Sequence, residues 1–195
     1  MSAFAQSLGE LLQAVEKDDT RRVEVWLGKG LEVNSTDSAG NTILMLATRF
    51  GHRDMVRLLL ARKADVRRRS PAGDTALMMA SLNGDVRIME DLVQAGAEIN
   101  QEGWTPLHYA AFEGKADAAR YLLAKGADKD AVAPNGYTPL MIAARNGKAD
   151  VAKLLLYEDP DVNFRTDNGI TALRIANERG MAELAELLRR AGAVE

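Results

Sequence analysis

The side chains that could carry out catalysis are few. The chain of 195 residues has two histidines, His52 and His108, and no cysteine. Histidine can act as a general base or a metal ligand, whereas the lack of cysteine excludes disulfides, thiolate nucleophiles and cysteine-bound metals. The sequence also lacks a Gly-x-Ser-x-Gly or His-Glu-x-x-His motif, a phosphate-binding loop and a dinucleotide-binding glycine pattern. We therefore predict a protein that is not an enzyme, with no catalytic residue, no cofactor and no metal.

The densest group of charges is the arginine run 67–69, with Arg62 and Lys63 close by. This run could contact a phosphate backbone or form an exposed turn. The acidic residues within 158–161 lack the spacing of a calcium loop. A net charge of -3 gives no basic surplus to attract nucleic acid, and no apolar stretch approaches the roughly 18 residues that span a membrane. We expect no nucleic-acid partner and no membrane insertion, and keep DNA or lipid binding through 67–69 as an alternative.

The first residues leave the compartment open. Ala3-Phe4-Ala5, followed by Gln6, has the small-x-small form that ends a secretory signal peptide, although the charged and apolar regions that should precede it are missing. One interpretation is the remnant of a trimmed export signal, which makes the protein periplasmic or secreted. The other is a chance triplet, which leaves it cytoplasmic. In both cases we expect a soluble protein.

Two residue types recur along the chain with a spacing of 33, shortened once to 30. Each glycine of the series lies nine residues after its threonine, so two markers share one register and indicate a copied unit. Each copy then ends in an apolar run and a turn, as in Gly126-Ala127-Asp128. The threonines are Thr42, Thr75, Thr105, Thr138 and Thr171, and the glycines are Gly51, Gly84, Gly114, Gly147 and Gly180.

Residues 105–110 read Thr-Pro-Leu-His-Tyr-Ala, which matches the ankyrin signature Thr-Pro-Leu-His-x-Ala in full. With the period and the turns, the sequence resembles the ankyrin-repeat family over nearly its whole length, and small bacterial, exported members in particular. The resemblance implies an all-α repeat solenoid in which each repeat is a helix-turn-helix plus a β-hairpin finger. We expect a single domain over 1–195 with six repeats, including N- and C-terminal caps. The expected repeats are 6–37, 38–70, 71–100, 101–133, 134–166 and 167–195.

The chemistry of one unit agrees with this resemblance. Threonine caps a helix by accepting a hydrogen bond from a free backbone N–H, and proline at the next position has a preset φ. Gly114 predicts the end of the first helix, and the second, expected over 116–124, should bury Ala119, Leu122 and Leu123. Since neither helix buries its apolar face alone, stacked units should form the core. Small residues should allow close approach at Ala47, Ala80, Ala110, Ala143 and Ala176.

The resemblance also gives both histidines a structural role. It assigns His108 to hydrogen bonds between repeats, and His52 to a position where ankyrin repeats often carry histidine. Methionine replaces the motif histidine at 45, 78 and 141, where we expect it to fill the core.

Two features depart from the repeat pattern. Ile99 and Gly103 are four residues apart, where other copies have seven, as between Lys129 and Gly136. This short finger either opens room around Trp104 or reflects a tolerated deletion or missing residues. Glycine follows the second helix in four repeats, whereas Lys63 and Asp159 occupy that left-handed position in the second and fifth. We predict that Lys63→Gly raises the melting temperature slightly.

The resemblance implies a binding groove lined by the finger tips and by the ends of the first helices. Aromatic and arginine side chains at these exposed positions are typical of interface hot spots. The alternative is that the rings pack onto neighbouring fingers. The tip positions are Asn41, Asp74, Trp104, Tyr137 and Ile170, and the helix-end positions are Arg49, Phe50, Leu82, Asn83, Phe112, Glu113, Arg145 and Asn146.

We therefore predict a non-catalytic protein-protein interaction module. It binds a partner protein of unknown identity through the concave groove and the hairpin tips, and it is a monomer on its own. A sharper alternative follows from the resemblance to small bacterial ankyrin proteins: an inhibitor or immunity-type protein that neutralises one specific enzyme or toxin.

Overall fold

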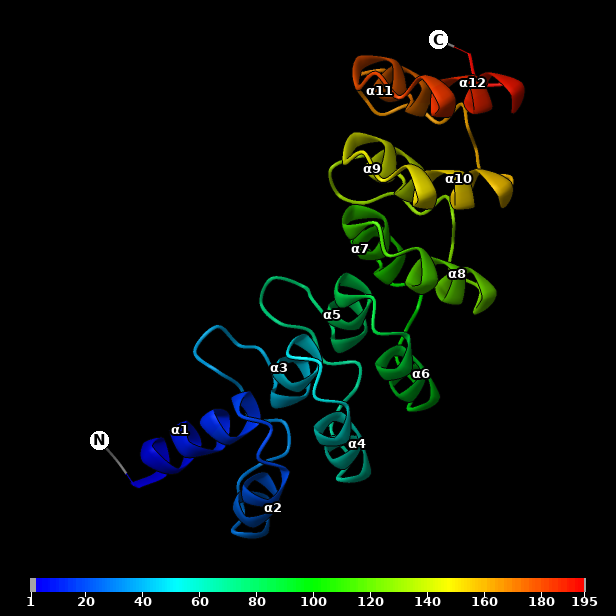
Figure 1. Ribbon diagram of the computed structural model, residues 1–195. Coiled ribbons are helices and arrows are strands. Elements are labelled where there is room, and N and C mark those ends of the chain that lie inside the picture. The colour runs from blue at the N-terminus through cyan, green and yellow to red at the C-terminus, as the bar shows by residue number, and fades with distance from the viewer. Residues whose placement is uncertain (1–2, 195) are drawn as a thin grey trace. The chain divides into compact units, whose positions relative to one another are not determined.

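The computed structural model describes residues 3–194, with side chains from residue 6 onward. Within these residues the chain forms twelve α-helices and no strand, which confirms the predicted all-α repeat fold. Successive helices form six pairs (Figure 1). The pairs are α1 (Ala3–Glu16) with α2 (Thr20–Gly28), α3 (Ile43–Arg49) with α4 (Arg53–Ala61), α5 (Ala76–Asn83) with α6 (Val86–Gln94), α7 (Pro106–Glu113) with α8 (Ala116–Ala124), α9 (Pro139–Arg145) with α10 (Ala149–Tyr157), and α11 (Ala172–Glu178) with α12 (Ala182–Arg190).

The chain divides into two compact units. Unit 1 comprises residues 1–80 and 87–98, and unit 2 comprises residues 81–86 and 99–195. In unit 1, α1 packs on α2 and α3, and α4 packs on α2 and α3. In unit 2, α9 lies between α7 and α11, and α10 lies between α8 and α12, so three helix pairs form a stack (Figure 1). The single domain and the six repeat boundaries stay predictions.

Threonine begins the first helix of the second to the sixth pair, where the sequence predicted it. Thr42 Oγ1 accepts a hydrogen bond from the backbone N–H of Met45 at 3.2 Å. Thr75 Oγ1 accepts one from the backbone N–H of Met78 at 3.3 Å. Gly114, with φ 76°, ends α7 in the left-handed conformation predicted for it. The local chemistry of capping therefore sets both ends of α7.

Small residues allow the helices to approach closely. The five repeated alanines, at 47, 80, 110, 143 and 176, are all fully buried. The predicted buried face of α8 needs one correction, because Leu123 is only half-buried while Ala118 is buried with Ala119 and Leu122. Leu123 lies about 100° around the helix from Leu122, at the edge of the packed face.

The fingers between helix pairs are turns without strands in the described part of the chain, so the predicted β-hairpins form no ladder beyond one isolated bridge, Thr36 to Thr42. A full-length finger closes through its backbone, as when Ala133 N–H donates to the Tyr137 carbonyl at 3.0 Å. The short finger closes differently. There the side chain of Gln101, which is buried, donates from Nε2 to the Trp104 carbonyl at 3.1 Å. One amide side chain thus replaces a backbone donor.

Two residues hold the left-handed conformation predicted for them. Lys63 has φ 65° and Asp159 has φ 53°, at the place where Gly126 has φ 84° in the fourth repeat. Asp18, with φ 57°, is a third non-glycine residue in this region that the sequence analysis did not predict. A side chain at such φ costs conformational energy, which is smaller for Asp than for Lys.

One polar position joins each repeat to the turn of the next. Asn34 Oδ1 accepts a hydrogen bond from the Asp65 backbone N–H at 2.8 Å. Asn100 Oδ1 accepts from Asp128 N–H at 2.8 Å, and Asn100 Nδ2 donates to the Gly126 carbonyl at 2.7 Å. An asparagine at this position therefore satisfies one donor and one acceptor of the following turn.

Arg67 occupies the same position in the second repeat. Its Nε donates to the Gly96 carbonyl at 3.1 Å, which reproduces half of the asparagine pattern. A guanidinium cannot accept a hydrogen bond, so the backbone N–H of Glu98 has no counterpart of the Asn34 to Asp65 bond. The connection at this turn is therefore incomplete.

Candidate functional site

Five of the predicted site residues lie together in unit 2. They line a shallow depression of about 280 Å³. Asn135 and Ile142, which the sequence analysis did not predict as site residues, complete its lining. The five predicted members are Trp104, Phe112, Tyr137, Arg145 and Asn146.

The repeat geometry brings these side chains together. Trp104 and Tyr137 stand directly before the helix caps Thr105 and Thr138. Arg145 ends α9 about two turns after its cap, on the same side as the finger tip. The tip residue Tyr137 and the helix-end residue Arg145 therefore meet along α9.

The aromatic rings of the depression differ in how firmly they are held. The Trp104 ring meets the rings of His108 and Tyr109 edge-on, each with ring centroids 5.6 Å apart. Phe112, in contrast, keeps 43% of its surface exposed at the end of α7. Trp104 is thus part of the packing of its own repeat, and Phe112 is an apolar side chain open to solvent.

Arg145 is the single charged side chain that lines the depression. Its guanidinium carbon lies 5.1 Å from the centroid of the Tyr137 ring, in cation–π contact. Next to it, Asn146 Nδ2 donates to the Ile142 carbonyl at 2.9 Å and so satisfies the end of α9. The arrangement offers aromatic surface beside one fixed cation.

The remaining predicted residues of unit 2 lie outside this depression. Glu113 borders a separate hollow together with Lys148 and Gly147. At the end of α5, Leu82 is half-buried and Asn83 is exposed. The sequence placed all three at helix ends correctly, but side-chain direction separates them from the aromatic group.

The predicted tip of unit 1 is occupied by its own polar network. Asp37 accepts hydrogen bonds from Asn41, at 3.0 Å from Nδ2 and 2.8 Å from the backbone N–H, and from the backbone of Ala39 at 2.9 Å. Partial burial opposes the charge of Asp37, but these bonds and the nearby Arg49 prevail and lower the pKa of Asp37. The Arg49 guanidinium also lies 5.2 Å from the Phe50 ring centroid, and Phe50 is exposed.

Asp74, at the tip of the next finger, is half-buried. Its backbone N–H bonds to Ser70 Oγ at 3.2 Å, and its carbonyl accepts from the Ser70 N–H at 2.9 Å. The residue therefore closes its own finger.

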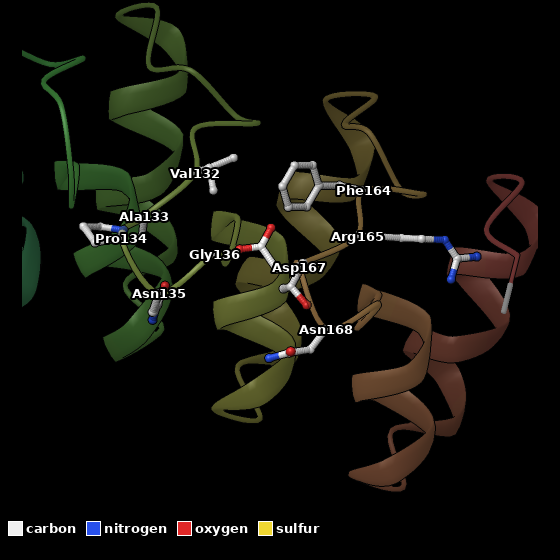
Figure 2. A pocket seen from close by; sticks show the side chains of 10 residues that line it. Val132, Ala133, Pro134, Asn135, Gly136, Phe164, Arg165, Asp167 and Asn168 are labelled. Carbon is white, nitrogen blue, oxygen red and sulfur yellow. The ribbon is translucent and has the colours of Figure 1, made fainter.

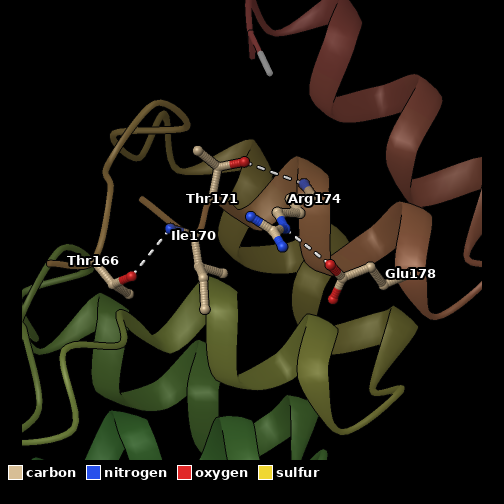
Figure 3. Close-up of polar contacts among 5 residues, drawn as sticks. All are labelled: Thr166, Ile170, Thr171, Arg174 and Glu178. Carbon is tan, nitrogen blue, oxygen red and sulfur yellow. Dashed lines mark hydrogen bonds and ion pairs between the residues drawn. The ribbon is translucent and has the colours of Figure 1, made fainter. Parts of the chain in front are cut away.

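In the last repeat an arginine of the first helix forms an ion pair with a glutamate of the same helix (Figure 3). Arg174, which stands at the motif position of His108, donates from Nε to Glu178 Oε1 at 2.8 Å. The bond to Glu178 raises the pKa of Arg174. The tip residue Ile170 is held by a bond from its N–H to Thr166 Oγ1 at 3.1 Å. Here the arginine charge is balanced within one helix.

A second depression of about 360 Å³ lies between two successive fingers of unit 2, at residues that were not predicted as a site (Figure 2). Val132 and Phe164 form apolar walls, and both Asp167 and Arg165 belong to the lining. Figure 2 shows the Arg165 side chain directed away from Val132. Opposite charges and scattered polar groups give this hollow no clear chemical preference.

His108 makes the hydrogen bonds between repeats that the resemblance assigned to it. Nδ1 accepts from the Thr105 backbone N–H at 3.1 Å, and Nε2 donates to the carbonyls of Ala131 at 3.1 Å and Tyr137 at 3.3 Å. Burial lowers the pKa of His108 from 6.5 to about 4, although the two carbonyls partly oppose the shift. The ring is therefore neutral near pH 7 and works as a structural connector.

His52 is engaged as well. Its Nε2 lies 3.1 Å from the Glu16 carbonyl, and its ring centroid is 5.7 Å from that of Phe50. Among the described residues, no group of three His, Cys, Asp or Glu side chains could hold a metal ion. In the described residues we also find no helix with the length and apolar character needed to cross a bilayer.

The export-signal interpretation falls at the edge of the structure. Ala3-Phe4-Ala5 opens α1, and the side chains of these residues lie outside the described part. The compartment and the bacterial origin implied by the resemblance therefore stay predictions.

Comparison with known families agrees with the repeat pattern. The family model for ankyrin repeats (3 copies) matches residues 11–102, 63–133 and 126–194. Together these matches cover most of the chain.

Three similar proteins are from mouse and human. Protein phosphatase 1 regulatory subunit 27 of Mus musculus is 43% identical over 78 residues, which cover 38% of this chain and 51% of that protein. Its Homo sapiens counterpart is 42% identical over the same length and the same shares. Protein fem-1 homolog A-like of Mus musculus is 33% identical over 86 residues, 43% of this chain and 13% of that protein. The match to the phosphatase subunits thus spans about half of their length.

Proposed function

Because the chain belongs to the ankyrin-repeat family, we propose that it is a non-catalytic module whose protein partner docks on the unit 2 depression and the adjoining finger tips. The ankyrin repeat is a protein-interaction module. The observation that carries the proposal is the meeting of Trp104, Phe112, Tyr137 and Arg145 in one open hollow. Exposed aromatic and arginine side chains that cluster in this way are the usual anchors of protein interfaces.

The other predicted positions are peripheral in this proposal, and those of unit 1 are assigned within their own unit. We assign weaker contacts to them because none of them lines the aromatic depression, and some are bonded within the chain, as Asn41 is to Asp37. The protein acts as a monomer, without nucleic acid, in this proposal. The peripheral residues are Asn41, Arg49, Phe50, Asp74, Leu82, Asn83 and Glu113.

An enzyme is a natural partner class within this proposal. Two of the similar proteins are named as regulatory subunits of a phosphatase, which favours a module that controls an enzyme by binding it. The inhibitor or immunity-type function is the sharper form of this hypothesis. Loss of the partner enzyme's activity at a one-to-one ratio of the two proteins would favour it.

The test begins with capture and chemical cross-linking of partners by the purified chain, followed by mass spectrometry and a measured affinity for the partner found. We expect Phe112→Ala to weaken binding by about tenfold or more at unchanged melting temperature, since its ring is exposed. Tyr157→Ala is the matched control, because Tyr157 is 82% exposed and lies outside the depression. Trp104→Ala separates binding from stability less well, because the Trp104 ring also packs on His108 and Tyr109. A partner that binds Phe112→Ala and Trp104→Ala as tightly as the natural protein would contradict the proposal.

The basic run at 67–69 supplies the competing hypothesis. Arg67 donates to the Gly96 carbonyl, and the side chains of Arg68 and Arg69 are exposed. Binding to DNA or anionic vesicles that weakens steeply with salt, and that disappears in Arg68→Gln/Arg69→Gln, would favour nucleic acid or lipid over a protein partner.

A further inference from the structure

The one charged side chain of the unit 2 depression indicates what kind of chemical group binds there. Arg145 makes no hydrogen bond and no ion pair with the part of the chain that the structure describes, and its guanidinium stacks on the Tyr137 ring. Stacking leaves the N–H groups at the edge of the guanidinium available. An arginine fixed by an aromatic ring is suited to bind a carboxylate through two parallel hydrogen bonds.

No anion of the depression competes for this charge. Arg145 is the one charged residue in the lining, and Glu113 borders a different hollow, beside Lys148. At the finger position where unit 1 has Asp37, unit 2 has the buried Ala133. The uncompensated cation therefore favours an anionic group supplied from outside.

The other residues of the lining indicate which kind of side chain the partner places beside that anionic group. Trp104, Phe112 and Ile142 supply apolar surface beside the guanidinium. The hollow of about 280 Å³ lies just below the range of roughly 300–1,000 Å³ typical of small-molecule sites. Its size and openness to solvent at Phe112 suit one or two side chains of a protein rather than a whole small ligand.

We infer that the segment bound here presents a carboxylate side chain beside a large apolar or aromatic one. The carboxylate pairs with Arg145, and the apolar side chain lies against Phe112 and Trp104. This inference rests on the proposed function, because it names the chemistry of the partner at the same site.

A phage library of random peptides, selected on the immobilised full chain, tests the inference without a known partner. We expect the enriched peptides to carry Asp or Glu beside Phe, Trp, Tyr, Leu, Ile or Met. Arg145→Gln should weaken a synthesised peptide of this kind by about tenfold, and Arg145→Lys by less, since lysine keeps the charge but not the planar fork. Arg120→Gln is the matched control, because Arg120 on α8 makes the same charge change beside Asp117, away from the depression.

A reversal of charge makes the test specific. The Arg145→Glu variant should no longer bind the acidic peptide. It should gain affinity for the same peptide with its acidic residue changed to lysine. Enriched peptides that require Phe112 but carry no acidic residue would overturn the inference and leave the proposed function standing. Peptides that bind Phe112→Ala unchanged, or a selection without enrichment, would count against both.

Discussion

The finger tips of the two units share a backbone and differ in how they use an arginine. Asp37 N–H donates to the Asn41 carbonyl at 2.9 Å in unit 1, and Ala133 N–H donates to the Tyr137 carbonyl at 3.0 Å in unit 2. In unit 1 the charge of Arg49 contributes to lowering the pKa of the Asp37 carboxyl, and in unit 2 the side chain corresponding to Asp37 is a methyl group.

One side chain therefore decides whether the finger places a carboxylate within electrostatic reach of the arginine at the helix end. The scaffold fixes where a finger tip and a helix end meet, and the residue types at the meeting point set its chemistry. This difference is why we assign the main binding role to unit 2.

The largest expected difference between the units is in their response to acid. His108 is in unit 2, whereas unit 1 has Met45 at the same position. Because burial lowers the pKa of His108 from 6.5 to about 4, the unfolded chain takes up the proton first as the pH falls. The neutral His108 ring therefore stabilises the folded state fully above pH 6.5. As the pH falls towards 4, the free energy of unfolding decreases progressively, by about 3 kcal/mol in total.

Urea unfolding at several pH values, with amide hydrogen exchange to resolve the helices, measures this effect. His108→Met is the matched control, since the chain itself uses methionine at 45, 78 and 141. The variant should show a flatter dependence between pH 6.5 and pH 4 in α7 to α10. Equal slopes for the variant and the natural protein would show that His108 does not govern the acid response.

Exchanging the finger residue tests the comparison directly. Ala133→Asp should give Arg145 an internal partner and weaken an acidic peptide by about tenfold, or about 1.4 kcal/mol. Ala133→Asn has nearly the same shape without the charge, and should weaken it much less. Binding measured by fluorescence anisotropy, with melting temperatures for both variants, checks the result, and equal losses would mean that shape rather than charge is responsible.

The left-handed residues give a smaller difference between the units. Lys63→Gly in unit 1 should stabilise the protein by about 1 kcal/mol, because glycine removes the steric cost of φ 65°. Asp159→Gly in unit 2 should stabilise the protein by less, since aspartate tolerates this conformation better than lysine. Thermal unfolding of the two variants provides the ranking, and a loss for Lys63→Gly would mean that the lysine side chain contributes contacts that outweigh its strain.

The smallest expected effect concerns the turn at Arg67. Arg67→Asn should donate to Gly96 and also accept from the Glu98 N–H, as Asn100 does for the next turn. We expect a gain of about 0.5–1 kcal/mol from the added hydrogen bond. Hydrogen exchange at Glu98 should slow in the variant, and unchanged exchange there would contradict the assigned bond.

Local features of this fold could be predicted from the sequence. Helix caps at Thr42 and Thr105, the stop at Gly114, and the left-handed Lys63 and Asp159 depend on residues a few positions apart, which the repeat pattern reveals. The burial of the repeated alanines followed from the same period.

Features that depend on side-chain direction could not be predicted in this way. Nothing in the pattern shows that Gln101 closes the short finger, or that Ile142 and Asn135 complete the depression. The electrostatic effect of Arg49 on Asp37 joins residues twelve positions apart and depends on their rotamers, and a period of 33 carries no information on rotamers. The sequence located the candidate positions, and the structure distinguishes Arg145, which lines the depression without a carboxylate, from Arg49, which acts electrostatically on Asp37.

The methionine caps have a consequence for oxidation. Met45 Sδ accepts the Thr42 backbone N–H at 3.4 Å, and Met78 Sδ accepts that of Thr75 at 3.2 Å, with both side chains buried. A peroxide can reach these sulfur atoms only when the helix end opens, and a sulfoxide oxygen would enlarge a side chain that is already enclosed. The rate of sulfoxide formation at Met45 and Met78 would therefore report local opening of each repeat without any added label.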